Sequence, residues 1–529
     1  MNHPADISAI FVHAGAGFHS HSNERAHLET CEKAARVAMA ILKSGGSALD
    51  AVEIAIMILE DAEITNAGYG SNMTLDGSVE CDATIVNHLG RGGAVGAVAQ
   101  VKNPISLARV ILDDSTKQLS LQRVPPNFLV GQGATEYAYD QGLVTLPPDA
   151  LISTAARERW RRWRQDLEAA EFKERQQDPA KYQEGQYKAH IRRPIVNQAQ
   201  LLTSPSTTVI ASALASPLPD TIADNLEHFS DQPHGIKSPS LTSPIRLEPM
   251  TPRVTKTRDG ASIDDSPVSS GRSATVCSLE PPAKRHRRSR SLEVHPSSTS
   301  KFDTASDVTN LASNKSALLI GDEHGHNKPD PADVDQISDT VGAIAIDIQG
   351  NIAAGSSSGG IGMKHRGRIG PAALVGIGTM VIPVDPNDSE QTCVAAVTSG
   401  TGEHIATTFA ASTCASRVYY CQQKCEDGTF EEVTEEEALR AMIASEFMGH
   451  PGVKNSHCQG AIGIMTVKKT VDGVFLYFGH NTDSFALASM SSEDTKPVSV
   501  MSRSNGNGSI AQGGRACRRK RQRTPNSIA

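Results

Sequence analysis

A long polar interruption divides this chain into two segments that can each fold. Residues 7–151 and 340–490 carry apolar residues at helix and strand spacing, whereas residues 152–339 between them do not. Beyond Asn197 this interruption is rich in Ser, Pro and Thr and poor in aromatic residues. Such a segment cannot bury enough apolar surface to offset the entropy lost on ordering. We expect a disordered insertion that begins with a charged helical stretch, and a polar, basic tail at 491–529.

The bulk composition agrees with two folded segments better than with three domains. Hydrophobic residues make up 38% of the 529 positions, although length alone would suggest about three domains. The first residues do not resemble a targeting peptide, and no run approaches the roughly 20 apolar residues of a membrane span. The nine cysteines form no C-x-x-C pair. We therefore expect a soluble intracellular protein with reduced thiols and no membrane partner.

Hydrophobic periodicity places the expected elements in both segments. Ser47 caps a helix, and Thr434 with Glu437 forms a capping box for another. Strands are expected at 9–12, 341–347, 352–356, 461–468 and 473–478, and helices at 24–43, 48–59, 403–422 and 435–447. Two halves of one sandwich, cut where they join, would account for a folded segment on each side of the interruption.

Thr340 begins an apolar strand where the polar interruption ends. A hydroxyl is a weak nucleophile at neutral pH and needs a base. If the bond between Asp339 and Thr340 is cut, Thr340 gains a free α-amine, a group with a pKa of about 7.7. That amine can take the proton from the hydroxyl of the same residue. One residue then supplies both nucleophile and base.

The glycine-rich and polar motifs around Thr340 resemble those of a known family. The motifs are residues 13–20 (HAGAGFHS), 59–61 (LED), 66–72 (NAGYGSN), 80–83 (ECDA), 102–104 (KNP), 339–340 (DT), 356–360 (SSSGG), 367–370 (GRIG) and 398–404 (TSGTGEH). In this order they resemble the type 2 asparaginases, which are N-terminal nucleophile (Ntn) hydrolases, and most of all their threonine aspartase (taspase) branch. The resemblance covers both folded segments. It does not extend to the long insertion or to the tail.

The resemblance implies an α+β fold, a four-layer αββα sandwich whose precursor cleaves itself into two subunits that stay paired and usually dimerise. It implies that Thr340 is the nucleophile and Ser358 the second hydroxyl beside it. Ser399 and Gly400 would form the oxyanion hole, and Asn66 would lie beside the site. Arg368 would hold a substrate carboxylate, for which its planar guanidinium is suited.

Each of these residues also has a purely structural interpretation. Arg368 can form a surface ion pair, residues 356–360 can be an ordinary loop, and residues 399–402 can cap a helix. His13 and His19 suit packing or loop fixing better than metal binding. The histidines, cysteines and acidic residues show no metal-ligand spacing. The glycines at 15 and 17 lack the remainder of a nucleotide-binding motif. We expect no cofactor and no metal.

Two positions favour cleavage after an internal aspartate of a protein. Asparaginases hold the substrate ammonium with an aspartate three residues after the arginine, and here that position is Pro371. A charge-assisted bond of about 1.5 to 3 kcal/mol is thereby missing. Asp339 also precedes the expected self-cleavage bond, with Gln336 three residues before it, as in the substrates of the threonine aspartase branch. The alternatives are an asparaginase or β-aspartyl peptidase, and an inactive sandwich that serves as a scaffold.

Two basic runs lie outside the folded segments, at 284–290 and 518–523. They suggest contacts with the nuclear import machinery and a location in the nucleus and cytoplasm. Solvated charge is the simpler alternative. Direct nucleic-acid binding is not expected without interleaved aromatic residues. Nuclear regulators would fit as protein substrates, since the threonine aspartase branch cuts such proteins.

Overall fold

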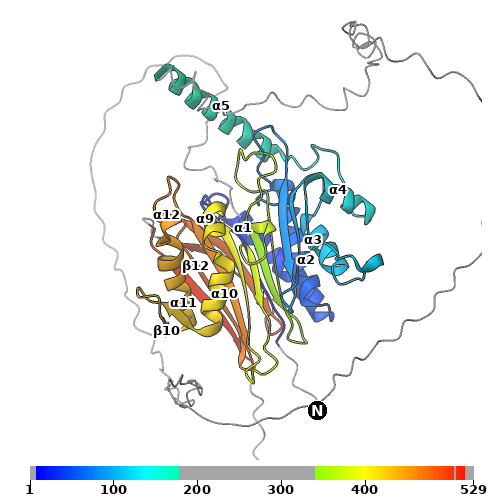
Figure 1. Ribbon diagram of the computed structural model, residues 1–529, viewed down its shortest axis with the longest axis vertical. Coiled ribbons are helices and arrows are strands. Elements are labelled where there is room, and N and C mark those ends of the chain that lie inside the picture. The colour runs from blue at the N-terminus through cyan, green and yellow to red at the C-terminus, as the bar shows by residue number, and fades with distance from the viewer. Residues whose placement is uncertain (1–6, 178–339, 505–507, 519–529) are drawn as a thin grey trace, which may run out of the picture. The chain divides into compact units, whose positions relative to one another are not determined.

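The computed structural model describes residues 7–177, 340–504 and 508–518. These residues form two large β-sheets that lie face to face, with helices on the outer face of each (Figure 1). A small two-stranded sheet pairs β9 Gln422–Lys424 with β10 Phe430–Glu432. The helices of the first folded segment are α1 Glu24–Lys43, α2 Ala48–Glu60, α3 Pro104–Asp114 and α4 Gly131–Asp140, and α5 Thr154–Gln177 lies at the start of the insertion. Those after it are α9 Gly402–Thr407, α10 Ala410–Tyr420, α11 Glu435–Ala441 and α12 Pro451–Lys454. This layering of helices and sheets is consistent with the expected Ntn fold.

In the larger sheet, groups of strands that precede the insertion alternate with groups that follow it. Its order is β14-β13-β1-β5-β6-β2-β3-β4. The bounds are β1 Ala9–Gly17, β2 Cys81–Val86, β3 Gly92–Val98, β4 Phe128–Val130, β5 Val341–Ile346, β6 Ile352–Ser358, β13 Ser484–Ser491 and β14 Val498–Arg503. Strand β1 therefore lies between two strands from beyond the insertion, and β6 pairs with β2.

Alanine-rich helices cover the outer face of this sheet. Helix α1 packs on β1 and β13, α2 on β5 and β6, and α3 on β2 and β3. Small side chains such as Ala34, Ala38 and Ala51 are fully buried, which lets the helices approach the sheet closely. The expected helices at 24–43 and 48–59 are confirmed, and Ser47 forms a full capping box with Asp50.

The smaller sheet has the order β15-β12-β11-β8-β7 and is covered by α10 and α11. Its strands are β7 Thr379–Ile382, β8 Cys393–Gly400, β11 Ile462–Thr470, β12 Gly473–His480 and β15 Ala511–Arg518. Apolar residues from both sheets, including Phe11, Ile344, Val397 and Met465, fill the space between the sheets. This core holds the two sheets together.

Two helices expected in the second segment are interrupted. The expected helix 403–422 divides into α9 and α10, because Phe409 adopts a left-handed conformation with φ 49°. The expected helix 435–447 begins at the capping box of Thr434 and Glu437, but it changes to a π-helix at Met442–Met448. The strands expected at 341–347, 352–356, 461–468 and 473–478 correspond to β5, β6, β11 and β12.

The segment 491–529, expected to be a polar tail, contributes two edge strands. β14 pairs with β13 and β15 pairs with β12. The charged helical stretch expected at the start of the insertion is α5, which projects from the sandwich in Figure 1. The basic run 284–290 and all of 518–523 except Arg518 lie outside the described residues, so nuclear import stays a prediction.

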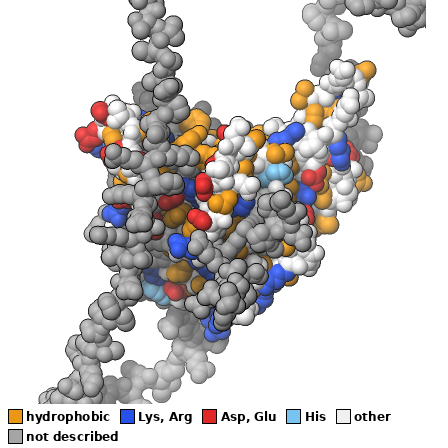
Figure 2. Space-filling model, turned by 90° about the horizontal axis from the view of Figure 1, so that it is seen from below, with side chains coloured by type: hydrophobic (Ala, Val, Ile, Leu, Met, Phe, Trp, Pro, Cys, Tyr) orange, Lys and Arg blue, Asp and Glu red, His pale blue; other side chains and the backbone are white. Residues whose placement is uncertain are grey.

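Acidic and basic side chains are interspersed with apolar ones on the face shown in Figure 2. Within the described ranges, the helices are all too short or too polar to cross a bilayer.

Candidate active site

Thr340 lies immediately before β5 and is buried, with 6% of its surface exposed. Its backbone N–H donates a hydrogen bond to Ser399 Oγ, with an N–O distance of 3.2 Å. Ser399 ends the buried part of β8, and its hydroxyl also accepts the Ala16 N–H at 3.0 Å. The Ser399 hydroxyl therefore joins the start of β5 to the glycine-rich end of β1. Asp339, the other half of the expected cleavage bond, lies outside the described residues.

Ser358 lies beside Thr340 through the pairing of β5 with β6. In this antiparallel pair Val341 is opposite Ser357, so the next step along the ladder brings Thr340 to Ser358. Side chains at opposite positions of antiparallel strands point to the same face. The Ser358 hydroxyl accepts the Gly360 N–H at 3.0 Å. The two hydroxyl residues expected in the site thus begin and end one hairpin.

Asn66 fixes the turn that follows Ser358. Its side-chain Nδ2 donates to the Gly360 carbonyl at 2.8 Å, and its backbone carbonyl accepts the Gly359 N–H at 2.8 Å. Its Oδ1 accepts the Asn72 N–H at 2.9 Å. A Cβ at Gly359 would come within 2.7 Å of that Oδ1, so this turn requires glycine. Asn66 therefore acts on the site through the backbone of residues 359 and 360.

Arg368 reaches into the same glycine-lined region. A Cβ on Gly360 would lie 3.0 Å from its Nη1, and one on Gly402 would lie 2.5 Å from its Nη2. Its guanidinium forms an ion pair with Glu403, with Nη2 and Oε1 2.8 Å apart. The arginine side chain is 15% exposed, whereas the glutamate side chain is 60% exposed. Because an exposed carboxylate contributes little to such a pair, an incoming carboxylate can replace Glu403 at small cost.

The structure bears on two purely structural interpretations. One is that Arg368 forms a surface ion pair, and the other is that residues 399–402 cap a helix. Arg368 does form an ion pair, but the arginine end of it is largely buried among glycines. Helix α9 begins at Gly402, and its N-cap residue Thr401 makes no side-chain capping bond. Gly400 closes β8 with φ 137°, a conformation that favours glycine.

His13 is a neutral residue in the wall of the site. Its imidazole is fully buried against Gly342 and the backbone of Thr340, and it contacts the ring of Phe485 at 5.3 Å. Burial lowers the pKa of His13 to about 3, despite the opposing contact with the Thr340 backbone. At neutral pH the ring therefore carries no charge, which agrees with the packing role expected for it.

Sequence reasoning did not assign roles to four charged residues near Arg368. They are Glu80, Asp82, Lys364 and Glu403. Lys364 is 2% exposed, and its Nζ donates to the Glu80 carbonyl at 2.8 Å. The motif 80–83 was recognised in the sequence, but nothing in its spacing indicated that its carboxylates contact a loop almost 290 positions later.

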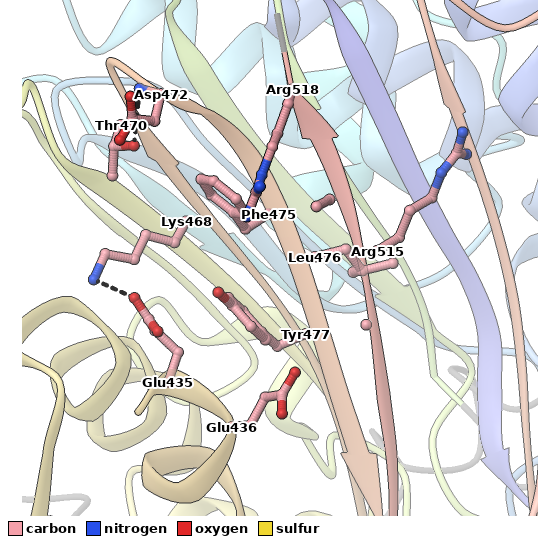
Figure 3. Close-up of a pocket in the computed structure, with 12 residues that line it drawn as sticks. Glu435, Glu436, Lys468, Thr470, Asp472, Phe475, Leu476, Tyr477, Arg515 and Arg518 are labelled. Atoms are coloured by element: carbon pink, nitrogen blue, oxygen red, sulfur yellow. Dashed lines mark hydrogen bonds and ion pairs between the residues drawn. The ribbon is translucent and has the colours of Figure 1, made fainter. Parts of the chain in front are cut away.

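The cavity drawn in Figure 3 lies away from these residues. It has a volume of about 540 Å³ and lies where β11, β12 and β15 meet the start of α11. Lys468 and Glu435 form an ion pair of 2.9 Å at its edge, and Arg518 lies over the ring of Phe475. Its lining includes none of the site residues expected from the sequence.

Comparisons with known proteins give a family and a set of partial relatives. The sequence profile of the Asparaginase_2 family, described as asparaginase, matches residues 7–193 and 283–472, which is more than half of the chain. The isoaspartyl peptidase/L-asparaginase of Rattus norvegicus is 40% identical over 151 residues, 28% of this chain and 43% of that protein. The protein of the same description from Homo sapiens is 37% identical over 153 residues, 28% and 46% of the two chains.

A bacterial relative gives a similar partial match. The isoaspartyl peptidase of Salmonella typhimurium is 33% identical over 156 residues, 28% of this chain and 47% of that protein. The chain thus spans less than half the length of each of these curated relatives.

Proposed function

The chain belongs to the asparaginase family of Ntn-type hydrolases, and from that membership we propose that it hydrolyses aspartyl bonds with Thr340 as the N-terminal nucleophile. The observation that carries this proposal is the position of Thr340. It is a buried threonine immediately before β5, its backbone N–H donates to Ser399 Oγ, and it precedes Val341, which pairs with Ser357 next to Ser358. A residue held in this way can become the first residue of a new chain without moving.

The proposed chemistry has an activation step and a turnover step. In activation, the Thr340 hydroxyl attacks the Asp339 carbonyl carbon, the peptide C–N bond breaks, and water hydrolyses the resulting ester. In turnover, the free α-amine takes the hydroxyl proton while the oxygen attacks a substrate carbonyl, and the proton passes to the leaving nitrogen. Water then releases the acyl group. Backbone and side-chain donors around Ser399 and Gly400 are the groups proposed to stabilise the oxyanion.

We propose that the substrates are proteins cut after an internal aspartate. Pro371 supports this, because it occupies the place at which the resemblance to asparaginases calls for an aspartate that holds a free ammonium. Pro371 is buried and opens the short 3-10 helix Pro371–Ala373, so no carboxylate is available from that position. Arg368 would then hold the side-chain carboxylate of the substrate aspartate.

The second candidate is an isoaspartyl peptidase or asparaginase. The names of the curated relatives favour it, since those described above are called isoaspartyl peptidases. In that case Arg368 would hold the α-carboxylate. The exposed carboxylate of Glu403, which is paired with Arg368, would then be a group able to receive the ammonium.

The test begins with the intact masses of purified wild-type protein and Thr340→Ala. We expect two wild-type fragments that meet between Asp339 and Thr340, and one intact chain for the variant. The cleaved enzyme is then given peptides with an internal aspartate, β-aspartyl dipeptides and free asparagine. Cleavage of the first class alone supports the endopeptidase, whereas hydrolysis of the β-aspartyl dipeptides or release of ammonia from asparagine supports the second candidate. A wild-type chain that remains intact after long incubation contradicts the activation step.

A further inference from the structure

Two carboxylates of the first folded segment hold the loop that presents Arg368. The Gly367 N–H donates to Glu80 Oε2 at 2.8 Å, and the Gly370 N–H donates to Asp82 Oδ2 at 2.7 Å. These two backbone groups flank Arg368 on either side. The loop is therefore fixed at both ends by side chains that lie almost 290 positions earlier in the sequence.

Asp82 is the more constrained of the two carboxylates. It is fully buried at the start of β2, and its second oxygen, Oδ1, accepts the Ala97 N–H at 2.8 Å. Ala97 has a φ of 46°, which an alanine rarely adopts, so the Asp82 contact also supports a strained point of β3. Both oxygens of Asp82 are thus occupied by backbone donors, one in each folded segment.

A buried carboxylate loses its contacts with water, and nearby charges and hydrogen-bond donors compensate the Asp82 carboxylate for this loss. Burial raises the pKa of Asp82, and the charges of Lys364 and Arg368 together with the two backbone donors oppose that rise. The Lys364 ammonium is itself tied to the Glu80 carbonyl. Asp82 is also opposite Ser358 in the pairing of β2 with β6. The carboxylate, the second hydroxyl residue and the arginine loop therefore form one connected unit.

We propose that Glu80 and Asp82 are positioning residues that set the place of the Arg368 guanidinium and so the strength of substrate carboxylate binding. The inference rests on the proposed function, in which Arg368 binds that carboxylate. Glu80 and Asp82 do not touch the substrate. They act by fixing the backbone on both sides of Arg368, because a guanidinium displaced by even 1 Å loses the geometry of a two-point contact.

The two residues differ in how a conservative change affects them. In Asp82→Asn one oxygen becomes an NH₂ group, so either the Ala97 or the Gly370 N–H faces a donor. In Glu80→Gln the remaining oxygen can turn to accept the Gly367 N–H, because the other Glu80 oxygen makes only a long 3.4 Å contact with Arg366. Asp82→Asn should therefore impair substrate binding strongly and Glu80→Gln weakly, while Glu80→Ala should be intermediate.

The experiment compares the steady-state kinetics of the cleaved variants with those of wild type. We expect KM for an aspartyl substrate to rise about tenfold or more in Asp82→Asn with kcat changed less than about twofold, because the contact with Arg368 is present in ground and transition states alike. In an Arg368→Ala background, Asp82→Asn should raise KM by less than about twofold further. Additive effects, or a fall in kcat at constant KM, would overturn the proposal.

Asp347→Asn is the matched control for a merely structural effect. Asp347 is a buried carboxylate that accepts the N–H groups of Ala48, Gln349 and Asn351 at 3.1, 3.0 and 2.9 Å, and it is outside the Arg368 loop. Its replacement should lower thermal stability to a similar degree and leave KM unchanged. A similar rise of KM in this control would count against a specific role of Asp82.

Amide hydrogen exchange separates a failure of this inference from a failure of the proposed function. Peptides covering 365–370 should exchange faster in Asp82→Asn and Glu80→Ala than in wild type, whether or not the protein hydrolyses aspartyl bonds. Unchanged exchange in both variants overturns the inference. If wild type cleaves none of the aspartyl substrates, the proposed function fails, and the exchange result still decides whether the loop is held as described.

Discussion

Replacing Ser399 by alanine removes one oxygen that serves two buried backbone donors. The hydroxyl accepts the Ala16 N–H at 3.0 Å and the Thr340 N–H at 3.2 Å, and Ser399 is fully buried. Alanine leaves both donors without this acceptor. The gap left by a single oxygen is too small to admit a water molecule in its place.

The structure sets the size of the expected effect. A buried donor left without a partner costs about 1 to 3 kcal/mol, so losing both contacts should lower the unfolding free energy by about 2 to 6 kcal/mol. The neighbouring Ser356 provides a comparison, since it is equally buried but shares a single hydrogen bond of 2.7 Å with the Thr379 hydroxyl. Ser356→Ala should cost about 1 kcal/mol.

The assay is urea unfolding of both variants in a Thr340→Ala background, which keeps every sample as one uncleaved chain. Thr340→Ala retains the backbone N–H, so the contact with Ser399 is still present to be lost. With Thr340 restored, Ser399→Ala should also slow self-cleavage, because the start of β5 is no longer held. If Ser399→Ala lowers the unfolding free energy no more than Ser356→Ala does, the two N–H contacts do not stabilise the fold as expected.

Two further predictions concern buried groups near the site. In Gly342→Ala the new Cβ would lie 2.4 Å from His13 Nε2. We therefore expect the unfolding free energy, measured by chemical denaturation, to fall by about 1 to 3 kcal/mol and self-cleavage to become slower. The control is Gly133→Ala in helix α4, where the new Cβ meets open space, and this change should be neutral or stabilising. Burial raises the pKa of Glu60 to about 8 from its usual 4.5. Between these two pH values the folded state keeps a proton that the unfolded state has lost. The contribution of Glu60 to the unfolding free energy therefore falls as the pH rises. Glu60→Gln should therefore gain stability over wild type by up to about 1.4 kcal/mol per pH unit from 4.5 to 8 in unfolding curves, and a constant difference would contradict the assignment.

Local signals in the sequence were sufficient for elements that are amphipathic and capped. Helix α1 follows the expected bounds because its apolar residues recur at helical spacing, α2 begins at the expected cap Ser47, and α11 begins at the expected capping box of Thr434 and Glu437. The break at Phe409 was missed because a left-handed phenylalanine gives no glycine or proline signal. β15 was missed because it contains Gly513 and Gly514 between polar residues. It is a strand only because β12 supplies its partner.

The site shows the same division between local and distant information. The motifs that contain Gly359, Gly360 and Gly402 were identified only by their resemblance to a family, and the structure places Asn66 and Arg368 against these glycines. The partner of Arg368 was not foreseen, since the position of Glu403 depends on how β8 ends beside the arginine loop. Contacts from Glu80 and Asp82 depend on the pairing of β2 with β6, which links segments on opposite sides of the insertion.

The alternation of strands in the larger sheet has a consequence for a chain that is cut before Thr340. The two pieces would share three strand boundaries, where β13 meets β1, β1 meets β5, and β6 meets β2. Separating them would require breaking all three, which amounts to unfolding the sandwich. Refolding of the cut protein then becomes a second-order reaction that slows on dilution, whereas the uncut chain refolds at a rate independent of concentration. Each processed molecule is thus assembled once, and a damaged piece cannot be replaced by exchange with another copy.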